Sequence, residues 1–97
     1  MLEKINTMEF YNYGRYSSDN YGVNSLCFVD AANNEFYFSY KTLVAFRYEG
    51  EFHIIKNYWN TTTGKHLNWI NPDKSIREDE ETFYKNYNRL VNGIMED

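Results

Sequence analysis

The chain has 97 residues, of which 42% are apolar, 25% are charged and 20% are aromatic. This length suits one domain rather than two cores, and the aromatic share excludes a largely disordered chain, because disordered segments are poor in aromatic residues. Ten Lys and Arg against fourteen Asp and Glu give a net charge of −4, which excludes the strongly basic footprint of a duplex-binding protein. We therefore expect a single domain over residues 1–97.

The first half of the chain is expected to be rich in β-structure, from residue 10 to residue 58. Residues 1–7 precede the first aromatic cluster, and we expect them to be frayed. Residues 10–22 mix aromatic residues with turn formers and lack a helical period, which predicts an irregular strand followed by a loop.

Four short apolar and β-branched runs follow, each bounded by turn residues. The two residues Glu49-Gly50 separate the last two runs and suit a tight hairpin. Consecutive strands with short connections predict an antiparallel meander. The predicted strands are residues 25–30, 35–39, 42–48 and 52–58.

A helical period begins after residue 58 and predicts a short helix over residues 61–70. Its apolar face would carry Trp59, His66, Leu67 and Ile70. One of the threonines at 61–63 is expected to cap the helix, and Asn71-Pro72 is expected to stop it.

The last predicted element is an amphipathic helix over residues 79–95. Its apolar positions, Phe83, Tyr87, Leu90, Val91 and Ile94, recur at helical spacing, and acidic residues begin it. The predicted fold class is therefore α+β: a four-stranded antiparallel β-meander, or five strands if residues 10–22 add one. A short helix and a C-terminal helix packed on the sheet follow it.

Residues that carry chemistry are few. Cys27 lies in an apolar run and is expected to be a buried free thiol, and His53 is expected to be a half-exposed strand residue. His66 is expected at the edge of the core. The chain has no second cysteine and no paired histidines at ligand spacing, so we expect no metal and no cofactor.

The segment Thr61–His66 offers hydroxyls, a lysine and the amides of a helix start. It lacks the upstream glycine of a phosphate-binding loop, so two interpretations stay open: a general anion site, or simple helix capping.

Tyrosines cluster before residue 22, with Arg15 among them. Their rings could stack on unpaired bases, dock a partner protein, or cover the sheet. The candidate binding residues, for protein or nucleic acid, are Tyr11, Tyr13, Arg15, Tyr16, Tyr21, Arg47, Lys65 and His66.

Acidic residues concentrate near the C-terminus, where residues 71–97 carry 4 basic and 7 acidic side chains, a net charge of −3. Such a cluster either attracts a basic partner or complements a helix dipole. The candidate acidic interface residues are Glu78, Asp79, Glu80 and Glu81.

The lone cysteine and the absence of an apolar leader or membrane-length segment predict a cytoplasmic protein without membrane association.

Three segments resemble a group of small uncharacterised proteins from bacteriophages and prophages: Tyr16–Gly22, Phe38–Arg47 and Asn57–Asn68. The resemblance covers roughly residues 13–70 and leaves out the C-terminal helix. It implies a mobile-element origin and transfers no catalytic residue. By analogy, small acidic phage proteins of this kind often act by occupying a host protein such as a CRISPR effector.

The leading hypothesis is a non-enzymatic binding protein that inhibits or redirects a host or phage protein associated with nucleic acid, in an infected or lysogenic bacterium. A single-stranded nucleic-acid module is the alternative. A small hydrolase is third, and it requires Cys27 to lie next to a histidine.

Overall fold

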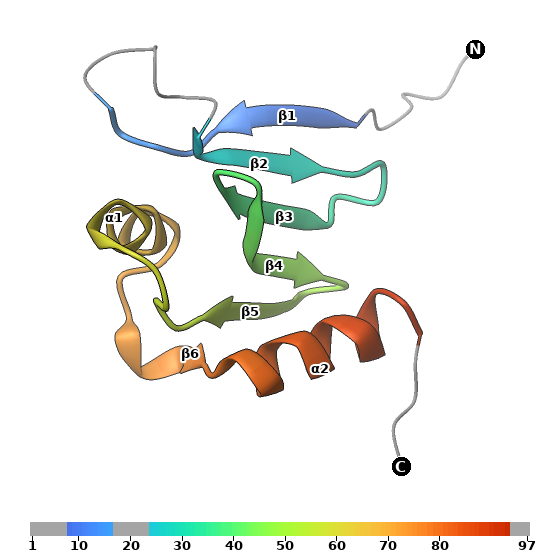
Figure 1. Ribbon diagram of the computed structural model, residues 1–97. Helices are drawn as coiled ribbons and strands as arrows, with labels where there is room; N and C mark the ends of the chain where they lie inside the picture. The colour runs from blue at the N-terminus through green and yellow to red at the C-terminus, as the bar shows by residue number, and fades with distance from the viewer. Residues whose placement is uncertain (1–7, 17–23, 94–97) are drawn as a thin grey trace.

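This computed structural model describes residues 8–16 and 24–93, which form a sheet flanked by two helices (Figure 1). Strands β1 to β5 form an antiparallel meander in chain order, and β6 adds to β5 in parallel. The helices are α1 (Thr61–Ile70) and α2 (Glu80–Leu90). The strands are β1 (Glu9–Asn12), β2 (Leu26–Val29), β3 (Glu35–Ser39), β4 (Thr42–Tyr48), β5 (Glu51–Ile55) and β6 (Arg77–Glu78).

The α+β class is confirmed, but the predicted strand count is wrong. Residues 9–12 supply the fifth strand, and β6 is a sixth that the sequence did not predict. β6 has only two residues and follows a 3-10 turn at Lys74–Ile76, so it carries no readable period. Its place is fixed by pairing, because the Lys56 amide donates to the Glu78 carbonyl at 2.8 Å.

The last predicted strand ends earlier than expected, at Ile55 rather than at residue 58. The Asn57 side chain redirects the chain there: it accepts from the Trp59 amide at 2.9 Å and donates to the Asn60 carbonyl at 3.0 Å. The predicted hairpin at Glu49-Gly50 is confirmed. Both residues have positive φ, 52° and 85°, as a two-residue turn of type I′ requires.

Helix α1 has the predicted bounds, but its N-cap is Asn60, whose side chain accepts from the Thr63 amide at 3.0 Å. The prediction of a threonine cap is wrong, because the chain turns one residue earlier. Trp59 precedes the cap, so it is not on the helix, and it is exposed.

Helix α2 begins after Asp79, whose carboxylate accepts from the Thr82 amide at 2.8 Å. It ends at Leu90 rather than at residue 95, and Gly93 has a positive φ of 68°, which suits a helix terminus. Predicted residues 94 and 95 lie outside the described part of the chain.

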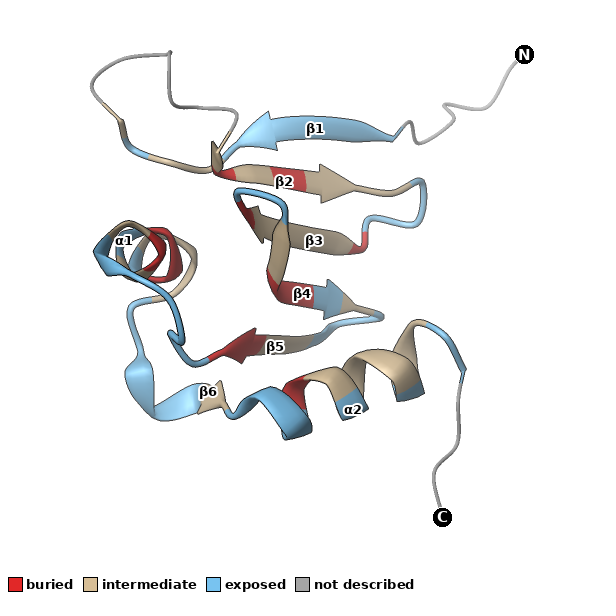
Figure 2. Cartoon of the chain, in the orientation of Figure 1, coloured by how far each residue is buried: buried red, intermediate tan, exposed pale blue. Residues whose placement is uncertain are grey.

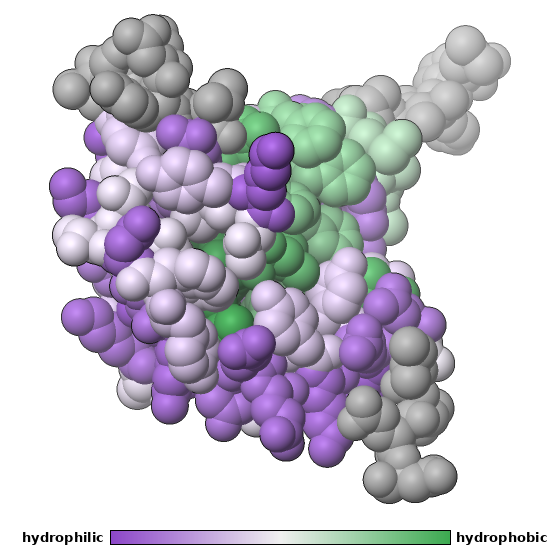
Figure 3. All heavy atoms as spheres, in the orientation of Figure 1, coloured by the Kyte–Doolittle hydropathy of each residue, from purple (hydrophilic) through white to green (hydrophobic). Residues whose placement is uncertain are grey.

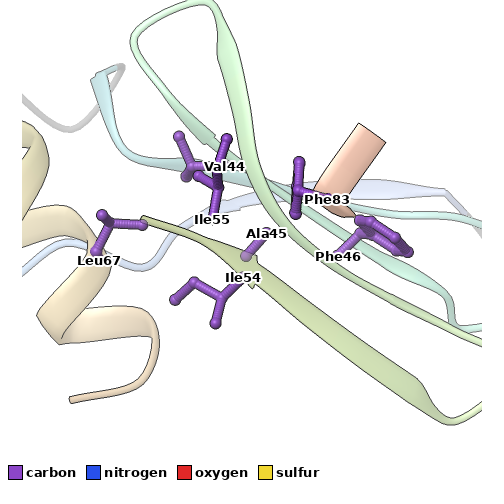
Figure 4. Packing of buried hydrophobic residues seen from close by; sticks show 7 residues of the cluster. All are labelled: Val44, Ala45, Phe46, Ile54, Ile55, Leu67 and Phe83. Atoms are coloured by element: carbon purple, nitrogen blue, oxygen red, sulfur yellow. The ribbon is translucent and has the colours of Figure 1, made fainter. Parts of the chain in front are cut away.

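The core lies where β4 and β5 meet the two helices, and burial is concentrated there (Figure 2). Phe83 of α2 packs against Phe46 of β4 with ring centroids 5.4 Å apart, and Tyr87 packs edge-on to Phe46 at the same distance. The close view shows Phe46 and Phe83 side by side (Figure 4). The buried apolar residues of this cluster are Val44, Ala45, Phe46, Ile54, Ile55, Leu67 and Phe83.

Candidate functional site

A buried hydrogen-bonded cluster joins α1 to the end of β3 and to the segment after β1. His66 is fully buried, and its Nδ1 lies 2.7 Å from Ser39 Oγ, which in turn lies 3.0 Å from Thr63 Oγ1. The other ring nitrogen, Nε2, is hydrogen-bonded to the Tyr16 hydroxyl. These four residues, Tyr16, Ser39, Thr63 and His66, are called the His66 cluster below.

Aromatic rings enclose the imidazole. Tyr13 and Tyr40 lie 6.0 and 5.8 Å from it between ring centroids, and Trp69 lies at 5.7 Å. Tyr13 is also anchored, since its hydroxyl donates to the Phe38 carbonyl at 2.8 Å. The segment after β1 is therefore tied to the sheet and to α1 by its tyrosines.

Burial sets the protonation states in this cluster. Desolvation lowers the pKa of His66 below its ordinary value and raises the pKa of Tyr16. At neutral pH the ring is therefore neutral, with one nitrogen donating and the other accepting, and the Tyr16 hydroxyl keeps its proton.

A hydroxyl bonded to an imidazole is one requirement of a hydrolase, but Ser39 is only 3% exposed and its hydroxyl already contacts both His66 and Thr63. Cys27 lies in β2 opposite Tyr11 and Tyr37, and burial raises the pKa of its thiol. Three strand spacings, about 14 Å, separate β2 from His53 in β5. The engaged hydroxyl of Ser39 and the separation of Cys27 from His53 give the hydrolase hypothesis no support.

The predicted binding residues do not form one surface. Tyr16 and His66 are hydrogen-bonded in the His66 cluster, and the Tyr13 ring packs against His66. Tyr11 is 42% exposed on β1, and partial burial followed by its hydrogen bond with Cys27 raises its pKa to about 12.

The predicted basic residues are also dispersed. Arg15 and Lys65 are exposed, while Arg47 lies 3.5 Å from Glu35 and stacks over the Phe52 ring at 4.9 Å. Predicted Tyr21 lies outside the described residues. Within residues 8–16 and 24–93, these tyrosines and arginines therefore form no continuous groove.

The four predicted acidic residues have different roles. Glu78 contacts His53 at 2.9 Å, and Asp79 caps α2, where the Thr82 amide lowers its pKa. Glu80 and Glu81 are exposed in the first turn of α2, as its dipole favours. Of the four, Glu80 and Glu81 are exposed with no role in capping α2 or in the His53 contact.

His53 lies between two carboxylates, with Glu51 Oε2 2.6 Å from its Nε2 and Glu78 Oε1 2.9 Å from its Nδ1. Arg89 reaches Glu51 at 2.8 Å, so the network connects the start of β5 with α2. Hydrogen bonds from His53 and then Arg89 lower the pKa of Glu51 from its ordinary value of 4.5.

Replacing Glu51 with glutamine is expected to reduce the fall in the free energy of unfolding at acidic pH, called the acid limb below. A depressed carboxyl pKa stabilises the fold above the unfolded value and loses that effect as pH falls through the folded pKa, so the limb lies below about pH 4.5. The Glu51–Arg89 ion pair is exposed, so the stability of wild type and that of E51Q should change with pH by amounts that differ by at most about 1 kcal/mol. Urea unfolding between pH 3 and 6 tests this. Identical acid limbs in wild type and E51Q would contradict it.

An apolar row crosses the sheet on the face that α2 partly covers. Strand register places Phe10, Phe28, Phe36 and Phe46 opposite one another, and neighbouring rings in β1, β2 and β3 lie 4.8 and 6.1 Å apart. Phe46 is buried beneath α2, whereas Phe10 is 64% exposed. Hydrophobic residues gather on the surface over β1 to β3, beside hydrophilic surface over α2 (Figure 3).

The row ends at an open strand edge. Within the described residues β1 is the terminal strand of the sheet, and all four of its residues are exposed. The Tyr13 amide points to β2, where it donates to the Ser25 carbonyl at 3.0 Å. Since backbone groups alternate in direction along a strand, those of Phe10 and Asn12 point outward. We call Met8, Phe10 and this outward edge the β1 surface.

In residues 8–16 and 24–93, no group of three or more histidine, cysteine or acidic residues is placed to hold a metal ion. Neither described helix has the length and hydrophobicity needed to cross a bilayer.

Comparison with known proteins gives one match, to a family model. No curated protein and no solved structure matches the chain significantly. A family model, described as a family of unknown function, matches residues 5–89. Because that match spans most of the sequence, the chain belongs to the family of unknown function DUF8033.

Proposed function

We propose that this protein is a non-enzymatic binding module that docks an extended segment of a host protein along the β1 surface. The observation that carries the proposal is the exposure of Phe10, 64%, on a strand whose outer backbone edge is unpaired among the described residues. An exposed aromatic side chain beside free amide and carbonyl groups is what strand addition uses: main-chain hydrogen bonds give affinity and apolar contacts give specificity.

The proposed docking surface uses phenylalanine rather than the predicted tyrosines. The Tyr13 hydroxyl bonds the Phe38 carbonyl and the Tyr16 hydroxyl bonds His66, whereas Met8 and Phe10 are 67% and 64% exposed. A row of rings leads inward from there to Phe28 and Phe36. A partner side chain laid over Phe10 would extend a row that already continues into the core.

Charge favours a basic partner. The protein carries a net charge of −4, and Glu80 and Glu81 are exposed on α2. Proteins that bind nucleic acid have such basic segments. The concrete form of the proposal is a phage-encoded inhibitor, acting in the bacterial cytoplasm, of a nucleic-acid-associated defence protein such as a CRISPR effector.

Phe10→Asp is expected to abolish capture of the partner without unfolding the protein, because the side chain is largely exposed. Tagged wild type, F10D and the control Ile76→Asp, altered at an exposed apolar residue away from β1, would be incubated with bacterial lysate and then with the purified candidate protein. Loss of a central aromatic contact costs about 2 kcal/mol or more, so F10D should bind at least about 30-fold more weakly, and I76D like wild type.

The two ways of failing are distinct. If no stoichiometric partner is recovered with wild type, the binding function is wrong. If a partner is recovered equally by F10D, the function stands and the β1 surface is the wrong site. Plaque formation by a phage on a bacterial strain with an active defence system tests the proposed inhibition. Expression of the wild-type protein in that strain should raise the number of plaques, and expression of F10D should not.

A further inference from the structure

We propose that a hollow between the β3–β4 turn and the start of α1 binds the base of a nucleotide, either free or unpaired in a single strand. This site uses different elements from the β1 surface. The hollow has a volume of about 140 Å³, close to that of a cavity that holds one benzene ring. Residues that line it include Ser39, Tyr40, Thr42, Trp59, Asn60 and Thr63.

The lining of the hollow is aromatic and polar. Tyr40 and Trp59 are 47% and 46% exposed, so both rings offer aromatic surface to a ligand. Thr42 and Asn60 add polar lining, whereas the hydroxyls of the buried Ser39 and Thr63 are already hydrogen-bonded to one another and, for Ser39, to His66. Aromatic rings stack on a planar base, and the polar residues Thr42 and Asn60 suit its polar edge.

Tyr40 is held in an unusual conformation. Its φ is 56°, in the left-handed region that favours glycine, and its amide donates to the Asn24 carbonyl at 2.8 Å. A bulky residue there costs about 1 kcal/mol or more in the backbone. The strain places the ring at the wall of the hollow and 5.8 Å from His66, so the tyrosine is present despite a local penalty.

The charge next to the hollow favours an anionic ligand. A second hollow of about 540 Å³ shares Tyr40 and Thr42 with the first and is also lined by Asn24 and Lys41. Among the described residues that line these two hollows, Lys41 is charged and none is a carboxylate, although the protein as a whole is acidic. A ring-sized hollow beside a lysine fits a base with its phosphate toward Lys41.

The test uses full-length protein at about 50 mM salt, where phosphate contacts are stronger than at physiological salt. A fluorescein-labelled 12-residue oligo(dT) is titrated by anisotropy, and AMP and UMP are titrated while the Trp59 indole signal is followed by NMR. Tyr40→Gly and Trp59→Ala should each weaken binding about tenfold or more. Tyr40→Gly relieves the positive φ, which offsets packing lost against His66, and its melting temperature is measured to show that the variant is folded. Lys41→Gln should reduce the salt dependence of strand binding.

Phe10→Ala is the matched control, since it removes an exposed ring from the β1 surface and should bind nucleotide like wild type. Binding of the strand alone identifies an unpaired nucleotide, and comparable binding of AMP or UMP identifies a free one; both support the site. The proposal is overturned if neither probe binds up to about 5 mM, or if Tyr40→Gly and Trp59→Ala bind as wild type does.

Discussion

Phe83→Ala is expected to lower the free energy of unfolding by about 3–5 kcal/mol, because it empties a fully buried position between α2 and the sheet. The ring contacts Phe46 at 5.4 Å and Tyr84 at 5.2 Å between centroids, and Phe46 is itself fully buried. A domain of this size has a total stability of about 5–15 kcal/mol, so the loss is a large fraction of it.

Urea unfolding followed by tryptophan fluorescence measures this loss, with Glu81→Ala as the control on the same helix. Glu81 is exposed in the first turn, so its removal should cost less than about 1 kcal/mol. A loss below about 1.5 kcal/mol for F83A would mean that α2 contributes little to the core.

Elements with strong local signals could be predicted from the sequence. The Glu49-Gly50 turn and the bounds of α1 depend on nearest neighbours: a glycine at positive φ in one case, and helical spacing ended by Asn71-Pro72 in the other. β6 could not be predicted, because two residues show no period and their strand conformation comes from pairing with β5. The cap of α1 was missed by one residue, since Asn and Thr both cap well.

The sites were harder to predict, because they depend on contacts between distant residues. His66 was expected at the core edge, but its partners Ser39 and Tyr16 lie 27 and 50 residues away. A serine that ends an apolar strand was the only local sign. The apolar row was missed for a similar reason: Phe10 and Phe28 join it only once the register of β1 and β2 is known.

His66→Ala is expected to destabilise the protein by about 2–4 kcal/mol at pH 7.5. The substitution removes a fully buried ring and leaves the hydroxyls of Ser39 and Tyr16 without their imidazole partner. Ser39→Ala is the matched comparison. It deletes one hydroxyl of the same cluster and keeps the imidazole, so a loss of about 1–2 kcal/mol is expected.

The dependence on pH separates a role of the neutral imidazole from simple packing. Burial depresses the pKa of His66 from 6.5, so the unfolded chain takes up a proton at higher pH than the folded one. Stability from the neutral ring is therefore complete above about pH 6.5 and is lost as pH falls toward the folded pKa, by at most about 1.4 kcal/mol per pH unit. Urea unfolding between pH 5 and 8 should show this limb in wild type and in S39A but not in H66A, so the gap between wild type and H66A should narrow on acidification. An H66A variant that keeps the wild-type limb would show that another group titrates there and that His66 contributes through packing alone.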